Sequence, residues 1–425
     1  MTALDFTVTP ILSESEDIIL APVPVSININ TIPWGKAYAY TFRDFDNSVQ
    51  YAAAYPPANT CPKSGCSVIL TLHGASVDAK SGAWKYAYQQ QNYTWIIYPT
   101  NRRRLGFDWQ GPGMDNAFYA LDSFIEALPG VPILNKPKYN ANKTMLVYAG
   151  HSMGGHGTLE LSTHYPDLAL AIAPAAGWIK WEYYVPFMIR VGYDLIDPIL
   201  RGLLQSSISE YDSDLYLPNI KAIPTIVRMG QNDTTVPPWN LRRVARVLDE
   251  FVGKPGFVEI SEIPGEGHWF GGVVDDAIMQ AFFDKHTKTQ AKPALPTSFE
   301  VRTMNPAHTG SRGGILILQL GLPFRLGRVL VKRQGSQWLL HTVNIRRFVF
   351  KDVPGIPRPS SITFKDGTSF SNLPKLPFHF CNLDGQKWTI CNNSDWTIKE
   401  RHAKNYGPAR QILEGPMLIV YGTKD

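Results

Sequence analysis

The sequence predicts an α/β protein built on a doubly wound, mostly parallel sheet and followed by a smaller β-rich domain. From about residue 35, short apolar runs alternate with segments of helical periodicity, as in a parallel sheet with helices on both faces. After a polar, proline-bearing stretch at residues 286–296 the helical period disappears. The chain also holds 34 Gly and 33 Pro residues, which favours turns and short strands over long helices.

The elements of the sheet domain follow from their hydrophobic patterns. Apolar, β-rich runs predict strands at residues 67–72, 93–98, 145–149, 169–172, 225–229 and 257–260. Apolar residues at helical spacing predict helices at residues 115–128, 156–165 and 241–252. Residues 180–220 break this alternation with a long, aromatic, proline-punctuated segment. We interpret that segment as a cap inserted over a pocket.

The pattern divides the chain into an N-terminal extension at 1–35, the sheet domain at 36–287 and the β-rich domain at 297–425. In the last of these, strands are expected at residues 299–302, 314–320, 328–332, 349–351 and 415–425. Because the final strand runs straight to the terminus, we expect the chain to be cut short there. Two interpretations of Trp338, Trp388 and Trp396 stay open: they fill the core of the domain, or they are exposed stacking platforms for a polysaccharide.

Composition excludes several classes of protein. The 425 residues carry a net charge of +5, and the only dense basic run is at residues 102–104, so a nucleic-acid partner is not expected. No apolar run reaches the length of a membrane span. The cysteines fall into two local pairs, Cys61 with Cys66 and Cys381 with Cys391, a spacing compatible with two disulfide loops in an oxidising compartment. Sequons at Asn92, Asn142, Asn232 and Asn392 also favour an extracellular location, although no signal peptide is visible and a cytoplasmic protein with free thiols is the alternative.

The strongest chemical signal is the sequence Gly-His-Ser-Met-Gly at residues 150–154. It follows a predicted strand and precedes a predicted helix, which is the context of the G-x-S-x-G nucleophile elbow. The turn is so tight that glycine is needed on both sides, and it lifts the serine hydroxyl above the sheet edge. Ser152 is therefore the predicted nucleophile.

A serine hydroxyl needs a general base and a residue that orients the base. Asp233 and His268 both come directly after predicted strands and follow the serine in the order acid, then histidine. Strand ends of a parallel sheet meet at one edge, where such sheets place their sites. We predict Asp233 as the acid and His268 as the base. The alternative candidates for the triad acid are Asp212, Asp214 and Glu266.

An oxyanion needs preorganised N–H donors. We predict the amides of Met153, next to the nucleophile, and Ala75, in the loop after an early strand. His73, Asp108 and Trp109 are tentative pocket residues, with structural roles as the alternative. No zinc or nucleotide motif is present, so neither a metal nor a cofactor is expected.

With strand, elbow, acid and base in place, residues 40–285 resemble the α/β-hydrolase superfamily, and within it the prolyl-oligopeptidase-like serine hydrolases. The segments that carry the resemblance to large secreted fungal members are 71–75, 101–103, 106–109, 150–156, 305–307 and 313–320. The resemblance implies Ser152, Asp233 and His268 as the triad and a serine peptidase as the function. Prolyl oligopeptidases proper place a β-propeller before the catalytic domain, whereas about 40 residues precede it here. A feruloyl-esterase or polyester-depolymerase type of carboxylesterase therefore stays open, as does a non-catalytic remnant.

Overall fold

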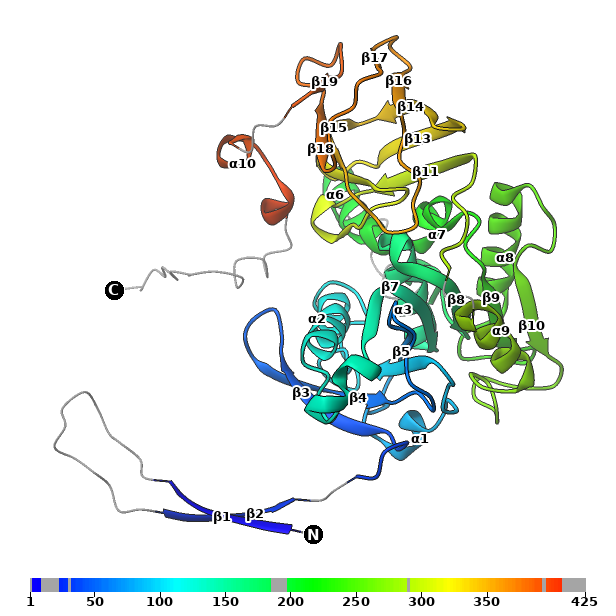
Figure 1. Cartoon of the computed structure of the whole chain (residues 1–425). Coiled ribbons are helices and arrows are strands. Elements are labelled where there is room, and N and C mark those ends of the chain that lie inside the picture. Colours follow the sequence, from blue (N-terminus) through cyan, green and yellow to red (C-terminus); the bar gives the residue numbers. More distant parts are fainter. Residues whose placement is uncertain are drawn as a thin grey trace, which may run out of the picture.

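The computed structural model describes residues 2–8, 23–29, 32–184, 197–288, 291–391 and 395–406. The strand expected at 415–425, the Asn392 sequon and part of the expected cap lie outside these ranges. At the N-terminus, β1 (Thr2–Val8) and β2 (Val23–Ile29) form an antiparallel pair, which stands apart from the body of the molecule in Figure 1.

The predicted mostly parallel sheet is confirmed. Its strand order is β10-β9-β8-β7-β5-β6-β4-β3; every pair from β10 to β6 is parallel, and β4 and β3 are added antiparallel. The strands are β3 (Tyr38–Arg43), β4 (Val49–Tyr55), β5 (Cys66–Leu72), β6 (Thr94–Tyr98), β7 (Ala141–His151), β8 (Ala169–Ala175), β9 (Ile226–Gly230) and β10 (Glu259–Ile263). The central strands β5, β6, β8 and β9 are buried along their whole length, which explains why they are continuous apolar runs in the sequence.

Helices cover both faces of this sheet (Figure 1). One face packs against α2 (Pro112–Ala127), α3 (Met153–His164) and α8 (Trp239–Val252), which share one hydrophobic core. The other face packs against α1 (Gly82–Lys85) and α9 (Ala277–Lys288) through a second core. The carboxyl ends of the parallel strands are thereby left as the edge at which loops gather.

The segment between β8 and β9 is helical where it is described. It contains α4 (Trp181–Tyr184), α6 (Pro198–Ile208) and α7 (Ser213–Tyr216), with 3-10 turns at Ser209–Tyr211 and Leu217–Ile220. In α6, the side chain of Asp197 caps the first turn by accepting from the amides of Ile199 and Leu200. Throughout the described parts of the chain, each helix is too short or too polar to span a bilayer.

The C-terminal part is β-rich, as predicted, and consists of two sheets around one core. The first contains β11 (Ser298–Thr303), β13 (Gly327–Gln334), β14 (Gln337–Val343), β16 (Ser361–Phe364) and β17 (Ser369–Phe370). The second contains β12 (Ile315–Leu320), β15 (Ile345–Phe350), β18 (Phe378–Cys381) and β19 (Thr389–Ile390), and α10 (Trp396–Lys399) follows. Disulfides join Cys61 to Cys66 and Cys381 to Cys391.

The interpretation of Trp338 and Trp388 as exposed stacking platforms is wrong. The two side chains are 2% and 3% exposed and pack in the core between the two C-terminal sheets. Trp338 lies inside because it alternates with the outward-facing Leu339 on β14 and shares the inner face with Leu340. Trp396 is half-buried, with the guanidinium of Arg347 over its ring.

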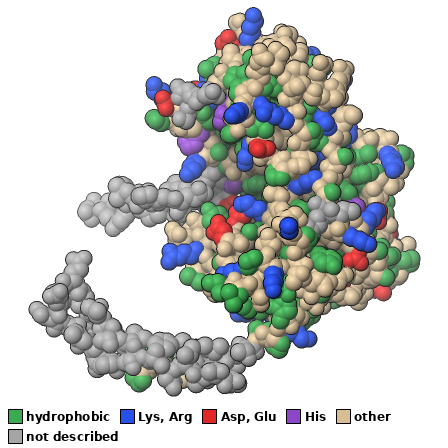
Figure 2. Space-filling view, viewed as in Figure 1, with side chains coloured by type: hydrophobic (Ala, Val, Ile, Leu, Met, Phe, Trp, Pro, Cys, Tyr) green, Lys and Arg blue, Asp and Glu red, His purple; other side chains and the backbone are tan. Residues whose placement is uncertain are grey.

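The β-rich part is held to the sheet domain by polar contacts. The Asp167 carboxylate, just after α3, accepts hydrogen bonds from the amides of Gly313 and Gly314 at 2.8 and 2.9 Å. Asn219 exchanges two hydrogen bonds with the backbone of Arg302. On the face seen in Figure 2, Lys and Arg side chains are scattered among acidic and uncharged residues.

Candidate active site

The turn between β7 and α3 has the geometry of a nucleophile elbow. Ser152 links the two elements with φ 59° and ψ −120°, a strained conformation for a residue with a side chain. A Cβ on Gly150 would overlap the carbonyl of Gly154, and a Cβ on Gly154 would overlap that of Leu72. The two glycines are therefore required by the close approach of the strand, the helix and the end of β5.

The structure brings Ser152, His268 and Asp233 together. Nε2 of His268 lies 2.8 Å from Oγ of Ser152, and Nδ1 of the same ring lies 2.7 Å from Oδ2 of Asp233. Because a carboxylate can only accept, Nδ1 carries the proton and Nε2 is left to accept from the serine hydroxyl. Ser152 is 8% exposed and the Asp233 side chain is fully buried. The arrangement can move a proton off the serine as the hydroxyl attacks.

Asp233 is held as an anion. Burial alone would raise the pKa of this carboxyl group, but hydrogen bonds from His268 and from the amides of Val236 and Thr235 outweigh it, and the pKa lies below its usual value. Both amides donate to Oδ1 at 2.9 Å, which leaves Oδ2 for the imidazole. The turn after β9 thus fixes the orientation of the acid.

His151, for which the sequence predicts no role in the site, contacts the loop that carries His268. Its Nε2 lies 2.7 Å from the backbone carbonyl of His268, and its ring lies against His268 and Trp269. Burial lowers the pKa of His151 to about 4, so the ring is neutral near pH 7 and donates from Nε2. His151 therefore ties the nucleophile turn to the histidine loop.

The two predicted oxyanion amides lie beside the nucleophile turn. Gly74 packs on the turn, because a Cβ there would lie 3.2 Å from Cβ of Ser152. Within the described residues, the amides of Ala75 and Met153 donate to no protein acceptor, whereas the next amide, that of Ser76, bonds to the carbonyl of Arg104. These two N–H groups are free to meet an anionic oxygen.

Two of the three tentative pocket residues are structural. His73 is fully buried, and its ring nitrogens contact the carbonyls of Gly74 and Thr100 at 2.8 and 2.9 Å. Trp109 is also fully buried and donates from Nε1 to the His73 carbonyl at 3.1 Å. Both side chains support the loop from within the core, where their polar groups are hydrogen-bonded. Asp108 is half-buried. Among the described residues, no cluster of His, Cys, Asp or Glu suited to a metal ion is found.

A stack of three rings leads from α3 to α4. His156 stacks on Trp178 at 4.8 Å, and Trp178 stacks on Tyr184 at 4.1 Å. Burial raises the pKa of the Tyr184 hydroxyl, and the nearby carboxylates of Asp108 and Asp233 raise it further. Tyr184 thus lies near Asp233, a placement that depends on how the segment between β8 and β9 folds and has no signal in the local sequence.

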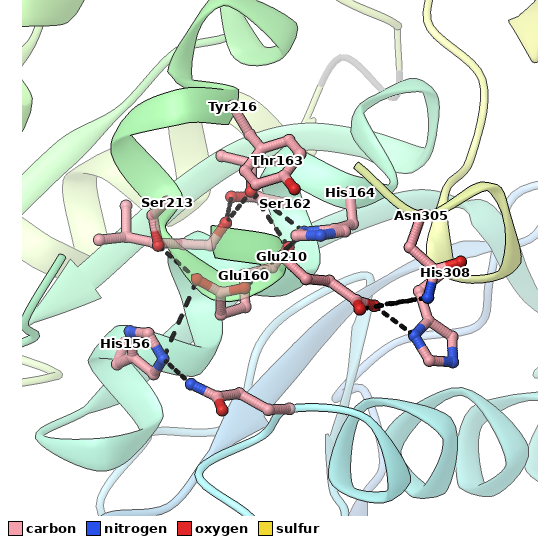
Figure 3. A network of polar contacts seen from close by, with 12 residues as sticks. His156, Glu160, Ser162, Thr163, His164, Glu210, Ser213, Tyr216, Asn305 and His308 are labelled. Carbon is pink, nitrogen blue, oxygen red and sulfur yellow. Dashed lines mark hydrogen bonds and ion pairs between the residues drawn. The ribbon is translucent and has the colours of Figure 1, made fainter. Parts of the chain in front are cut away.

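Behind the nucleophile, α3 carries a buried polar network (Figure 3). Glu160 is fully buried; its Oε1 accepts from the Ser213 hydroxyl at 2.5 Å, and its Oε2 has no hydrogen-bond partner among the described residues. Farther along, the Glu210 carboxylate contacts His308 at 2.6 Å and Asn305 at 3.1 Å. The network links α3 to the segment between β8 and β9 and, through Glu210, to the β-rich part.

Glu160→Gln should stabilise the fold at alkaline pH. Burial raises the pKa of Glu160 well above its usual value, and nearby acids add to the rise: Asp212, Glu210 and Asp214. The folded state therefore keeps a proton that the unfolded chain loses near pH 4.3, so stability falls as pH rises from there through the folded pKa. Glutamine has no proton to lose, and we expect a gain of about 1 kcal/mol or more at pH 8.

Thermal unfolding of wild type, Glu160→Gln and the exposed-residue control Glu126→Gln at pH 5 and pH 8 checks this. The melting-temperature advantage of Glu160→Gln should grow between the two pH values, whereas Glu126, which lies exposed on α2, should give none. If Glu160→Gln has no higher melting temperature than wild type at pH 8, Glu160 is not a buried acid with a raised pKa.

Residues 123–290 match the sequence model of the prolyl oligopeptidase family. The matched segment contains Ser152, Asp233 and His268. Over this segment the chain is similar to that family. The resemblance predicted from the sequence is thereby confirmed.

The chain has a curated relative in Arthroderma benhamiae, described as an uncharacterized secreted protein. The two are 28% identical over 377 residues, which cover 84% of this chain and 39% of the relative. The chain thus spans about two fifths of the length of that relative.

Solved structures similar to this chain include the acylaminoacyl peptidase of Pyrococcus horikoshii, with 16% identity, TM-score 0.44, and coverage of 59% of this chain and 42% of that one. A putative dipeptidyl aminopeptidase IV from Bacteroides ovatus has 14% identity and TM-score 0.44, with coverage of 60% and 36%. An S-formylglutathione hydrolase from Agrobacterium tumefaciens has 15% identity and TM-score 0.40, with coverage of 61% and 96%.

Proposed function

We propose that the chain is a serine peptidase that works through an acyl-enzyme formed on Ser152. The observation that carries the proposal is the continuous hydrogen-bonded series from Ser152 Oγ through His268 to Asp233. His268 takes the hydroxyl proton as Oγ attacks the carbonyl carbon of the substrate, and returns it to the leaving amine. A water molecule then attacks the acyl-enzyme with the same proton transfers through His268, and the acyl group leaves Ser152 as a carboxylic acid.

Two charges develop in the transition state, a negative one on the substrate oxygen and a positive one on His268, and each has groups that stabilise it. The amides of Met153 and Ala75 receive the oxyanion, and the N-terminal end of α3 directs its dipole at the same place. Asp233, whose pKa is held low by its hydrogen bonds, stabilises the imidazolium that forms on His268. His151 acts on the same base indirectly, by holding its backbone.

The prolyl oligopeptidase match supports a peptide substrate. Two disulfides and the secreted relative support an extracellular location. The helices between β8 and β9 are proposed to cap the site, and residues 36–287 and 297–425 are proposed to be separate domains.

Matched substrates test the peptidase proposal. Purified protein is assayed with acetyl-alanyl-alanyl and acetyl-alanyl-prolyl substrates, each as the p-nitrophenyl ester and as the p-nitroanilide. We expect Ser152-dependent cleavage of both ester and anilide in at least one pair, because the base can protonate an amine leaving group. Turnover of the esters alone would replace the peptidase by a carboxylesterase.

A further inference from the structure

The loop between β6 and α2 holds Asp108 in a strained conformation. Asp108 and Trp109 have φ angles of 52° and 63°, the left-handed region that residues with a side chain avoid. The loop closes around the buried side chain of Asn101, whose Oδ1 accepts from the Phe107 amide at 3.2 Å. Such strain persists only where surrounding structure imposes it, and it is concentrated at functional sites.

The residues that follow Asp108 tie this loop to the elements around the nucleophile. Trp109 is bonded to the His73 carbonyl in the loop of the Ala75 amide, and its indole would overlap a Cβ on Gly157 in α3. Nε2 of Gln110 lies 2.9 Å from Nε2 of His156, one turn after Ser152. The residues that follow Asp108 are thus anchored on the oxyanion loop and on the first turns of the nucleophile helix.

The Asp108 carboxylate is a partly buried charge for which the described residues provide no hydrogen-bond or ion-pair partner. Burial raises its pKa to about 6, and no hydrogen bond or cation in the described residues offsets that rise. The arginines of the same loop contact other groups: Arg102 pairs with Asp44 and Asp46, Arg104 pairs with Asp78, and Arg103 lies over the ring of Phe107. The carboxylate lies near Tyr184, which is also near Asp233. A desolvated carboxylate at the edge of the reacting groups is therefore left to interact with what binds there.

We propose, resting on the hydrolase function proposed above, that Asp108 is a subsite for a positively charged group of the substrate, an ammonium or a guanidinium. A cation supplies the charge-assisted hydrogen bond that the protein does not provide, and the cost of desolvating the carboxylate is then offset. A neutral substrate leaves that cost in place. The site should discriminate between a cationic substrate and its neutral isostere by about tenfold or more.

Two matched substrate pairs test the subsite in the full chain. One pair compares alanyl-alanyl p-nitrophenyl ester with its N-acetylated form, and the other compares N-acetyl-lysyl with N-acetyl-norleucyl p-nitrophenyl ester. Values of kcat/KM are measured for wild type, Asp108→Asn and Asp122→Asn, with Ser152→Ala as the blank. Asp122 is a matched control because it is a partly exposed carboxylate on α2 that pairs with Lys143.

Wild type should prefer the cationic member of at least one pair about tenfold or more. Asp108→Asn should lose that preference and Asp122→Asn should keep it. The inference is overturned if wild type shows no preference in either pair, or if the preference survives Asp108→Asn. Either result leaves the serine hydrolase chemistry intact, because the neutral esters report it separately.

If no ester is turned over in a Ser152-dependent way, the proposed function fails and the subsite is decided by binding. Benzamidine and its neutral analogue benzamide are titrated calorimetrically into wild type and Asp108→Asn. Benzamidine binding that weakens about tenfold in Asp108→Asn, with benzamide unaffected, supports the subsite. Equal benzamidine affinity in the two proteins overturns it.

Discussion

Ser152→Ala should lower kcat by about 10⁴-fold or more on every substrate that the protein cleaves. The hydroxyl is the group that lies 2.8 Å from Nε2 of His268, and an alanine leaves the base with no nucleophile to activate. Residual turnover would then come from the two oxyanion amides and from substrate binding alone. The fold should survive, because the substitution removes one atom and keeps the backbone of the elbow.

Covalent labelling checks the same prediction without assuming a substrate. A fluorophosphonate should label wild type and fail to label Ser152→Ala. Ser162→Ala is the matched control, since Ser162 lies on the same helix, is fully buried and donates only to the Leu159 carbonyl. Labelling of Ser152→Ala at the wild-type rate would move the nucleophile elsewhere, and circular dichroism of the variants shows that each is folded.

The elbow, the acid and the base were predictable because their signals are local. Gly-x-Ser-x-Gly after a strand fixes the turn by sterics alone, and Asp233 and His268 each follow an apolar run that ends at the same sheet edge. The contacts from His268 to Ser152 and Asp233 then follow from the parallel order of β7, β9 and β10. That part of the site does not depend on the segment between β8 and β9.

The rest depends on contacts between distant segments. The helix predicted at 156–165 in fact begins at Met153. The sequence pattern missed its first residues because α3 is buried at every position, so its apolar periodicity is weak. Glu160 on that helix gives no sign of burial in the sequence, since an acid among helical residues is typical of a solvated face. Asp108 and Trp109 are adjacent in sequence but differ in burial. The left-handed backbone at both residues turns the indole of Trp109 into the core.

Gly154→Ala should destabilise the protein by about 3 kcal/mol and impair catalysis as well. The added Cβ would overlap the carbonyl oxygen of Leu72 and lie 2.9 Å from that of His73. Both obstacles are backbone atoms of a buried strand end, so no side-chain rotation relieves them. To make room, α3 must move away from β5, and the Met153 amide moves with it relative to Ala75.

Displacing one oxyanion donor should lower kcat by about 10²-fold to 10³-fold. The loss of stability is measured by urea unfolding, and the loss of activity by kcat on the folded fraction. Gly202→Ala is the matched control, because a Cβ on Gly202 in α6 meets nothing within 4 Å. That change should leave kcat as it is and strengthen α6 by up to about 1 kcal/mol. If Gly154→Ala had the wild-type urea midpoint, α3 and β5 would not be packed as closely as the elbow requires. The proposed positions of the Met153 and Ala75 amides would then lose their support.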